Sequence, residues 1–225
     1  YDFFIYGAAA ALIFNKLFFP NLDPLTGVLA AFGTYAVGFI GRPLGGLVFG
    51  HFGDKIGRKS MLLLTLMLMG IPTVLIGLLP TYESIGYWAA ICLVILRFIQ
   101  GMAMGGEWGG AVLMAVEHAP EGKKGFWGSL PQASTGGGLM LASIALGLVS
   151  LLPEPALFSW GWRIPFLASI VLLAVGWYIR VKVPESPDFE KVKEQAENIK
   201  VPALQVFKQH PKQLITIIVA RAAEN

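Results

Sequence analysis

Charged and polar side chains interrupt the apolar stretches of this chain at positions where they could do chemistry. Arg97, Gln100 and Glu107 lie within one stretch, and on a helix they fall within an arc of about 80°. An arginine can hold a carboxylate through two parallel hydrogen bonds, and a buried carboxyl group can take up a proton near neutral pH. Structural pairing between helices is the alternative for Arg97 and Glu107, and the sequence leaves it open.

A second apolar stretch begins with an acidic residue. Asp2 and Tyr6 share a helix face with Lys16. If Lys16 reaches the membrane interface, Asp2 lies about 21 Å deeper, inside a hydrocarbon core of about 30 Å. We therefore expect Asp2 and Glu107 to be the candidates for proton coupling. For Asp2 the alternative is a hydrogen bond between helices.

Four residues are candidates for binding a small molecule: Tyr6, Arg97, Gln100 and Gln132. Gln132 lies close to a run of three glycines, Gly136 to Gly138. Glycines weaken a helix and permit bending or close packing, so gating and packing are both open for this run. The run does not follow a strand and is no nucleotide-binding fingerprint. Because the sequence shows no metal-ligand spacing and no nucleophile triad, we expect neither an enzyme, nor a metal site, nor a cofactor.

The composition indicates that most of the surface faces something other than water. Of the 225 residues, 55% are apolar and 14% are charged, whereas soluble domains carry about 25% charged residues. About 20 apolar residues cross a membrane as a helix. Membrane helices are predicted at 1–19, 25–49, 60–79, 87–116, 125–152 and 162–181. The formal net charge of +3 is no sign of a nucleic-acid partner, because the basic residues cluster beside these helices.

The segment from Gly50 to Lys59 joins the second and third predicted helices, and we predict a tight charged turn. Gly46 and Gly50 are four residues apart, so they share a face that another helix can approach closely. Asp54 can cap the positive N-terminus of a neighbouring helix, and the basic residues can anchor the turn at an anionic leaflet. The predicted residues of a cytoplasmic gate are Gly50, Asp54, Lys55, Gly57, Arg58 and Lys59.

The basic residues also predict the orientation in the membrane. Three connections hold 12 of the 17 lysines and arginines, and the alternate connections hold none. The basic ones are 51–59, 117–124 and 180–212, and the others are 20–24, 80–86 and 153–161. Because cytoplasmic loops carry an excess of lysine and arginine, the basic set is predicted to be cytoplasmic. Trp160, Trp162 and Tyr82 are expected in an aromatic belt on the outer side.

Three regions are predicted along the chain. Residues 1–183 form a six-helix membrane bundle, residues 184–212 a charged cytoplasmic linker, and residues 213–225 the start of a seventh helix. The first helix is expected to extend upstream of Tyr1, because Asp2 lies too deep to begin it.

Several segments together resemble the metabolite:proton symporter family of the major facilitator superfamily. They are residues 1–7, 15–20, 42–46, 50–59, 100–110, 160–166, 185–187 and 221–225. Within the family the chain looks most similar to bacterial shikimate transporters, and more distantly to α-ketoglutarate and proline/betaine transporters.

The resemblance implies an all-α membrane protein, the six-helix N-terminal bundle of a twelve-helix transporter, with two inverted three-helix repeats. It implies proton-coupled symport of a small organic acid or zwitterion by alternating access in a bacterial inner membrane. The proton gradient would be the driving force, and a C-terminal six-helix half the partner of this bundle. Antiport and facilitated diffusion are the alternatives, and a non-transporting membrane sensor is the alternative from another class.

Overall fold

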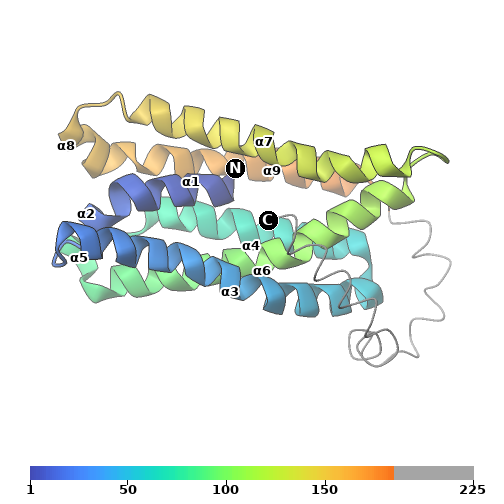
Figure 1. Ribbon diagram of the computed structural model, residues 1–225, viewed down its shortest axis with the longest axis horizontal. Coiled ribbons are helices and arrows are strands. Elements are labelled where there is room, and N and C mark those ends of the chain that lie inside the picture. Colours follow the sequence, from blue (N-terminus) through green and yellow to red (C-terminus); the bar gives the residue numbers. More distant parts are fainter. Residues whose placement is uncertain (185–225) are drawn as a thin grey trace.

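The computed structural model describes residues 1–184, except for the side chains of Asp54 and Lys55. All regular structure in that range is helical, and the long helices lie side by side along one axis (Figure 1). The helices are α1 (Asp2–Ala9), η1 (Ala10–Phe14), α2 (Asn15–Phe18), α3 (Pro24–Ile56), α4 (Arg58–Leu78), α5 (Tyr82–Ile85), α6 (Tyr87–Glu117), α7 (Lys124–Val149), α8 (Glu154–Ala156), η2 (Leu157–Gly161) and α9 (Arg163–Lys182). The predicted linker from residue 185 on and the predicted seventh helix lie outside the described residues.

Helical structure is present at all six predicted positions, and at five of them the helix is of membrane-spanning length. Helices α3, α4, α6, α7 and α9 are each long and apolar enough to cross a membrane. The predicted helix at 1–19 consists of α1, η1 and α2, which follow one another directly through a π-helical turn. Such turns are frequent at functional sites, and the apolar pattern does not reveal them. The prediction of an all-helical membrane protein is confirmed.

The predicted turn at 50–59 is wrong in its extent. Helix α3 continues to Ile56 and α4 begins at Arg58, so Gly57 alone joins them. Continuing the helix keeps the backbone N–H and C=O groups paired where a loop near the membrane would expose them. Gly57 has φ of 112°, a conformation in which side chains are strained. The sharp reversal between α3 and α4 therefore depends on glycine at this position.

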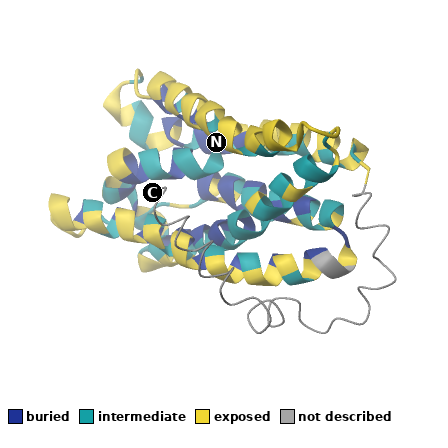
Figure 2. Ribbon diagram, turned by 45° about the vertical axis from the view of Figure 1, so that its right-hand side comes forward, coloured by how far each residue is buried: buried dark blue, intermediate teal, exposed yellow. Residues whose placement is uncertain are grey.

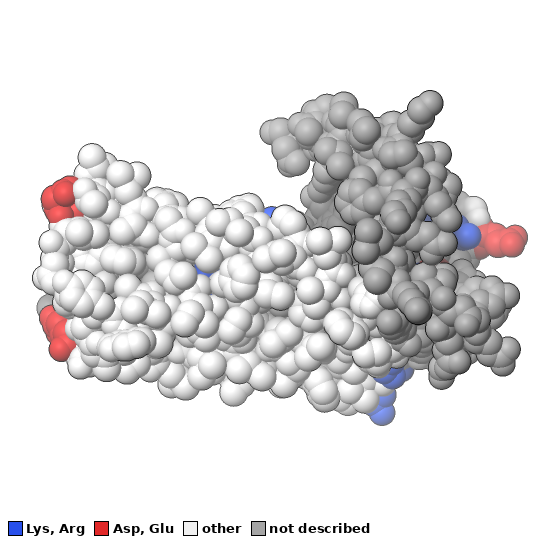
Figure 3. Space-filling view, turned by 90° about the horizontal axis from the view of Figure 1, so that it is seen from below, with Lys and Arg blue, Asp and Glu red and all other residues white. Residues whose placement is uncertain are grey.

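The basic connections meet at one end of the bundle, which we call the basic end (residues 57–59, 118–124 and 180–182). Here Lys59 donates a hydrogen bond of 2.8 Å to the carbonyl of Val181, and Arg58 forms an ion pair with Glu117. Both cations were expected to anchor at the lipid headgroups, and both have partners within the bundle instead. Figure 3 shows basic side chains at one end with an acidic group beside them, acidic side chains at the other end, and an almost uncharged surface between.

The other connections meet at the opposite end. Lys16 lies 2.8 Å from Glu154 in an exposed ion pair, and the hydrogen bond from Lys16 lowers the pKa of Glu154. Asn21 donates to the hydroxyl of Tyr82 across 2.8 Å. The predicted grouping of the connections is thus confirmed, and the assignment of the basic end to the cytoplasm stays a prediction.

Helices α3 and α6 pack backbone against backbone. A Cβ atom built at Gly101 of α6 would collide with the backbone of Gly38, and one at Gly105 would collide with the backbone of Arg42. From the other side, a Cβ at Gly41 would lie 2.8 Å from the carbonyl oxygen of Phe98. Small residues let membrane helices approach this closely. This contact holds together the two helices that carry half of the predicted site residues.

An aromatic cluster fills the bundle near the end opposite the basic one. Trp162 packs against Phe14, Phe18 and Phe166 with ring centroids 5.9 to 6.1 Å apart. It is fully buried, whereas Trp160 is 52% exposed. The expected place of Trp162 in an outer belt is therefore wrong, because its ring is needed to fill the space between the first helix and α9.

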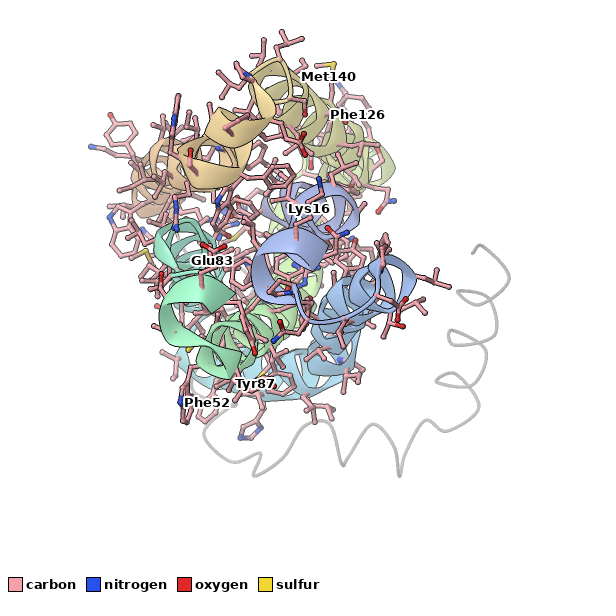
Figure 4. All side chains as sticks on the ribbon, turned by 90° about the vertical axis from the view of Figure 1, so that its left-hand side faces the viewer. Lys16, Phe52, Glu83, Tyr87, Phe126 and Met140 are labelled. Carbon is pink, nitrogen blue, oxygen red and sulfur yellow. The ribbon has the colours of Figure 1, made fainter. Side chains whose placement is uncertain are left out.

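The outer faces carry the apolar side chains that a bilayer would cover. Figure 2 shows α7 exposed along most of its length. In the view along the bundle, Phe126 and Met140 lie on α7 at the outer side of the molecule (Figure 4), and both side chains are exposed. The buried polar and charged side chains lie inside the bundle and define where a site can be: Thr34, Thr65, Thr73, Arg97, Gln100 and Ser169.

Gly101→Ala tests the α3–α6 contact. The added methyl group would press on the Gly38 backbone, and overpacking of this kind costs about 1 to 3 kcal/mol. We expect a lower unfolding free energy for the purified full-length protein in detergent, measured by chemical denaturation. Gly109→Ala is the matched control on the same helix, because nothing lies within 4 Å of its Cβ position. Equal stability of the two variants would contradict the close contact.

Candidate functional site

Arg97 of α6 is almost completely buried, with 1% of its surface exposed. Its guanidinium carbon lies 4.4 to 4.6 Å from the ring centroids of Phe3, Tyr6 and Tyr35. Each such contact stabilises a cation by about 0.5 to 2 kcal/mol. Gly38 of α3 leaves room for this side chain, because a Cβ there would lie 2.8 Å from Nε of Arg97. We call Arg97 and its three rings the arginine cage.

Hydrogen bonds use only part of the Arg97 side chain. Nη1 donates to Oε1 of Gln100 (3.2 Å), Nε2 of Gln100 donates to Thr73 (2.7 Å), and the Thr73 hydroxyl donates to the carbonyl of Met69 (2.8 Å). Nε and Nη2 of Arg97 are buried and have no hydrogen-bond partner in the described part of the chain. Because a buried unsatisfied donor costs about 1 to 3 kcal/mol or more, the two free donors point to an anion at this position.

Tyr6 belongs to the cage through its ring rather than its hydroxyl group. The hydroxyl donates to Thr34 across 2.7 Å, and Thr34 donates to the carbonyl of Ala31 across 2.6 Å. This chain of bonds fixes α1 against α3. The structure thus brings Tyr6, Arg97 and Gln100 together as the sequence predicts, and their contact with a ligand stays a prediction.

Asp2 lies next to the same network. Its Oδ1 accepts a hydrogen bond of 2.8 Å from Ser169 of α9, and its carboxylate lies beside the hydroxyl group of Thr73. Within the described residues no ion pair joins Asp2 to a cation. Thr73 therefore lies between Asp2 and Gln100, and Gln100 is bonded to Arg97.

Glu107 has a different environment from Asp2. It forms an ion pair with Arg180 of α9, and Arg180 also donates to the carbonyl of Leu62 in α4. The side chains of both partners are 22% exposed. This is the interhelical pairing that the sequence left open, and it ties three helices together near the basic end. A role of Glu107 in proton coupling stays a prediction.

Gln132 is not brought to the cage. It lies on an exposed part of α7, and so do Gly136 and Gly137, whose Cβ positions have no atom within 4 Å. Gly138 differs, because a Cβ there would lie 2.8 Å from the backbone nitrogen of Tyr1. Close packing explains one glycine of this run.

Two of the predicted gate residues, Gly50 and Arg58, border a cavity of about 140 Å³ between α3, α4 and α6. Its wall includes Arg58 and seven glycines, which are Gly46, Gly50, Gly53, Gly105, Gly106, Gly109 and Gly110. The side chains of Asp54 and Lys55 lie outside the described part of the structure. The gate itself therefore stays a prediction.

Sequence reasoning missed several residues of this site: Phe3, Tyr35, Arg42, Thr73 and Ser169. Arg42 could have been found, because it is a charged residue within an apolar stretch, as Arg97 is. Thr73 and Ser169 carry no comparable signal, since small hydroxyl residues are common in membrane helices and also bond within their own helix.

Comparisons with known proteins agree with this architecture. The family described as "Sugar (and other) transporter" matches residues 1–210. The shikimate transporter of Escherichia coli K12 is 50% identical over 100% of this chain and 52% of that protein. The proline/betaine transporter of the same strain is 41% identical over 85% of this chain and 38% of that protein. The chain thus spans about half the length of the curated relatives it matches.

A solved structure shows the same fold. The inward-open form of the Escherichia coli xylose transporter XylE superimposes with a TM-score of 0.70 and 21% identity. The match covers 100% of this chain and 52% of XylE. At this identity the likeness shows the fold alone, which is that of the N-terminal half of the larger bundle.

The Glu107–Arg180 pair can be tested by a double-mutant cycle of Glu107→Gln and Arg180→Gln. Because the pair is largely buried, we expect a coupling energy of about 0.5 to 3 kcal/mol in the unfolding free energy. The exposed pair of Lys16 and Glu154 is the matched control, and a smaller coupling energy is expected because water screens it. A coupling for Glu107 and Arg180 no larger than in the control would contradict a structural pair.

Proposed function

This chain belongs to the sugar (and other) transporter family of the major facilitator superfamily, and we propose that it is half of a proton-coupled symporter. The substrate is a small organic acid or zwitterion, carried by alternating access between two six-helix halves. The protein lies in a bacterial inner membrane with the basic end in the cytoplasm. The proton gradient supplies the driving force, and no cofactor takes part.

The unsatisfied guanidinium of Arg97 carries this proposal. Two of its N–H donors are buried without a partner among the described residues, and a carboxylate could accept from both. The compounds in the names of the two relatives fit such a pair of donors, because shikimate, proline and betaine each carry a carboxylate. Intramembrane charged groups mark substrate pathways and proton relays in membrane proteins.

Asp2 is the better candidate for the coupled proton. Glu107 forms an ion pair with Arg180, and a carboxylate in such a pair must give it up to become protonated. Among the described residues, Asp2 accepts a hydrogen bond from the hydroxyl group of Ser169 and lies beside that of Thr73, and hydroxyl groups can accept as well as donate. Protonation of Asp2 therefore breaks no ion pair.

The glycine-lined cavity at the basic end is where the second half would close the cytoplasmic side. Asp54 is proposed to cap a helix of that half, a contact worth about 0.3 to 2 kcal/mol. Gly57 supports this role, since its backbone conformation brings α3 and α4 together at that level.

Uptake of organic acids into proteoliposomes by the full-length protein tests the proposal. Accumulation that depends on an imposed pH gradient supports symport, and uptake without accumulation indicates a facilitator. Dependence on a gradient of opposite direction indicates an antiporter. Absence of uptake for every carboxylate tested, with the protein folded, favours a membrane sensor.

Arg97→Lys should raise the apparent KM for substrate about tenfold or more, because an ammonium group lacks the planar two-pronged geometry. Initial uptake rates over a range of concentrations give the value. Arg163→Lys is the matched control, since both hydrogen bonds of Arg163 go to backbone carbonyls, those of Gly77 and Leu79. An unchanged KM in Arg97→Lys would assign Arg97 to helix pairing.

Asp2→Asn should abolish accumulation driven by a pH gradient while exchange of labelled for unlabelled substrate continues. The reason is that asparagine keeps the hydrogen bonds but cannot take up the proton. Glu107→Gln is the comparison variant, and both its accumulation driven by a pH gradient and its substrate exchange are measured. Accumulation by Asp2→Asn at the wild-type rate would remove Asp2 from coupling and leave Glu107 as the candidate.

A further inference from the structure

Arg42 of α3 is a second cation beside the arginine cage. Its guanidinium carbon lies 4.2 Å from the ring centroid of Phe39 and 4.4 Å from that of Phe3. Its Nε is buried without a hydrogen-bond partner, and no carboxylate pairs with it within residues 1–184 as far as the structure describes them. Like Arg97, Arg42 therefore has a buried donor without a partner in the described bundle.

The two arginines lie close together. The ring of Phe3 contacts both, with the guanidinium carbon of Arg97 at 4.5 Å from its centroid. Because their separation cannot exceed the sum of the two centroid distances, the two guanidinium carbons are at most about 9 Å apart. Arg42 also lies one helical turn beyond Gly38, against which Arg97 packs. The two cations therefore share the ring of Phe3 and are near enough for one small anion to interact with both.

Two like charges at this distance repel each other, and the repulsion is strong where water is scarce. An anion bound between the two guanidinium groups removes this repulsion. A zwitterion removes it only in part, because the zwitterion also carries a positive charge. The aromatic faces that could accept an ammonium group are also in use. The rings of Phe3, Tyr6 and Tyr35 already contact the guanidinium group of Arg97, so a cationic group of a ligand would have to compete with it.

We infer that Arg42 is a second anion-binding group of the substrate site and makes the site select organic anions over zwitterions. The inference rests on the proposed function and narrows its substrate class. Arg42 is less buried than Arg97, so it meets an incoming carboxylate nearer the edge of the bundle, and Arg97 holds it at full depth.

The test compares an anion with two zwitterions in proteoliposomes that contain the full-length protein. Labelled shikimate serves as the anion, and unlabelled proline and glycine betaine compete with its uptake. Wild-type protein should prefer shikimate. Arg42→Gln should raise the KM for shikimate about tenfold or more and leave the inhibition constants of the zwitterions nearly unchanged, so the preference is largely lost.

Two variants make the comparison specific. Lys16→Gln removes one positive charge at the far end of the bundle and should keep the wild-type preference, which excludes an effect of net charge alone. Arg42→Lys keeps the positive charge but loses the paired donors of the guanidinium group. Its preference for shikimate over the zwitterions should therefore fall between those of wild type and Arg42→Gln. If Arg42→Gln does not fold, Arg42→Lys decides, and a wild-type preference in this variant overturns the inference.

The outcomes separate this inference from the proposed function. Uptake of none of the three compounds by folded wild-type protein contradicts the proposed function itself. If Arg42→Gln raises the KM for shikimate and the inhibition constants of the zwitterions by the same factor, the inference is overturned, because Arg42 then serves packing or pairs with the second half. A preference of the wild-type protein for glycine betaine over shikimate also overturns the inference, but it does not contradict the proposed symporter function.

Discussion

The close contact of α3 and α6 is the constraint on which the site depends. Where glycines face each other, the two backbones touch, and any side chain at Gly101 would collide with α3. The Arg97 side chain, one turn earlier on α6, therefore has to pass across the surface that Gly38 leaves open. It emerges among aromatic rings of the first helix and α3. A wider spacing of the helices would leave this cation without its cage.

The arginines of the bundle fall into two groups according to their hydrogen-bond partners. Arg163 donates to two backbone carbonyls at 2.8 Å each, and Arg180 donates to Leu62 and pairs with Glu107. Both stabilise contacts between helices. Arg97 and Arg42 are held mainly by aromatic faces, which stabilise the charge but accept no hydrogen bonds from the donors at the edge of the guanidinium group. A buried donor left open in this way is costly, so we propose that the two arginines mark the place where a ligand binds.

The sequence predicted the helices well because each is a long apolar stretch, and it predicted the burial of Arg97 because a charge in such a stretch must turn inward. It could not predict partners. Arg180 was counted among the cytoplasmic basic residues, yet it reaches back to Glu107. Trp162 has the composition of an interface residue, and only the packing of the first helix on α9 shows that its ring is in the core. The extent of α3 was missed because glycines indicate a turn in water, whereas near a membrane the helix keeps its backbone bonds.

The hydroxyl group of Thr73 is where the proposed proton site and the proposed substrate site meet. A hydroxyl group has one proton to donate and two lone pairs. In the structure Gln100 uses one lone pair and the carbonyl of Met69 receives the proton. Because Asp2 lies beside Thr73, we propose that ionised Asp2 competes with Met69 for that proton, whereas protonated Asp2 donates to the second lone pair instead. Protonation of Asp2 would then change the bonds of Thr73, and Gln100 would pass the change to Arg97. Coupling through neutral groups of this kind needs no direct contact between acid and arginine.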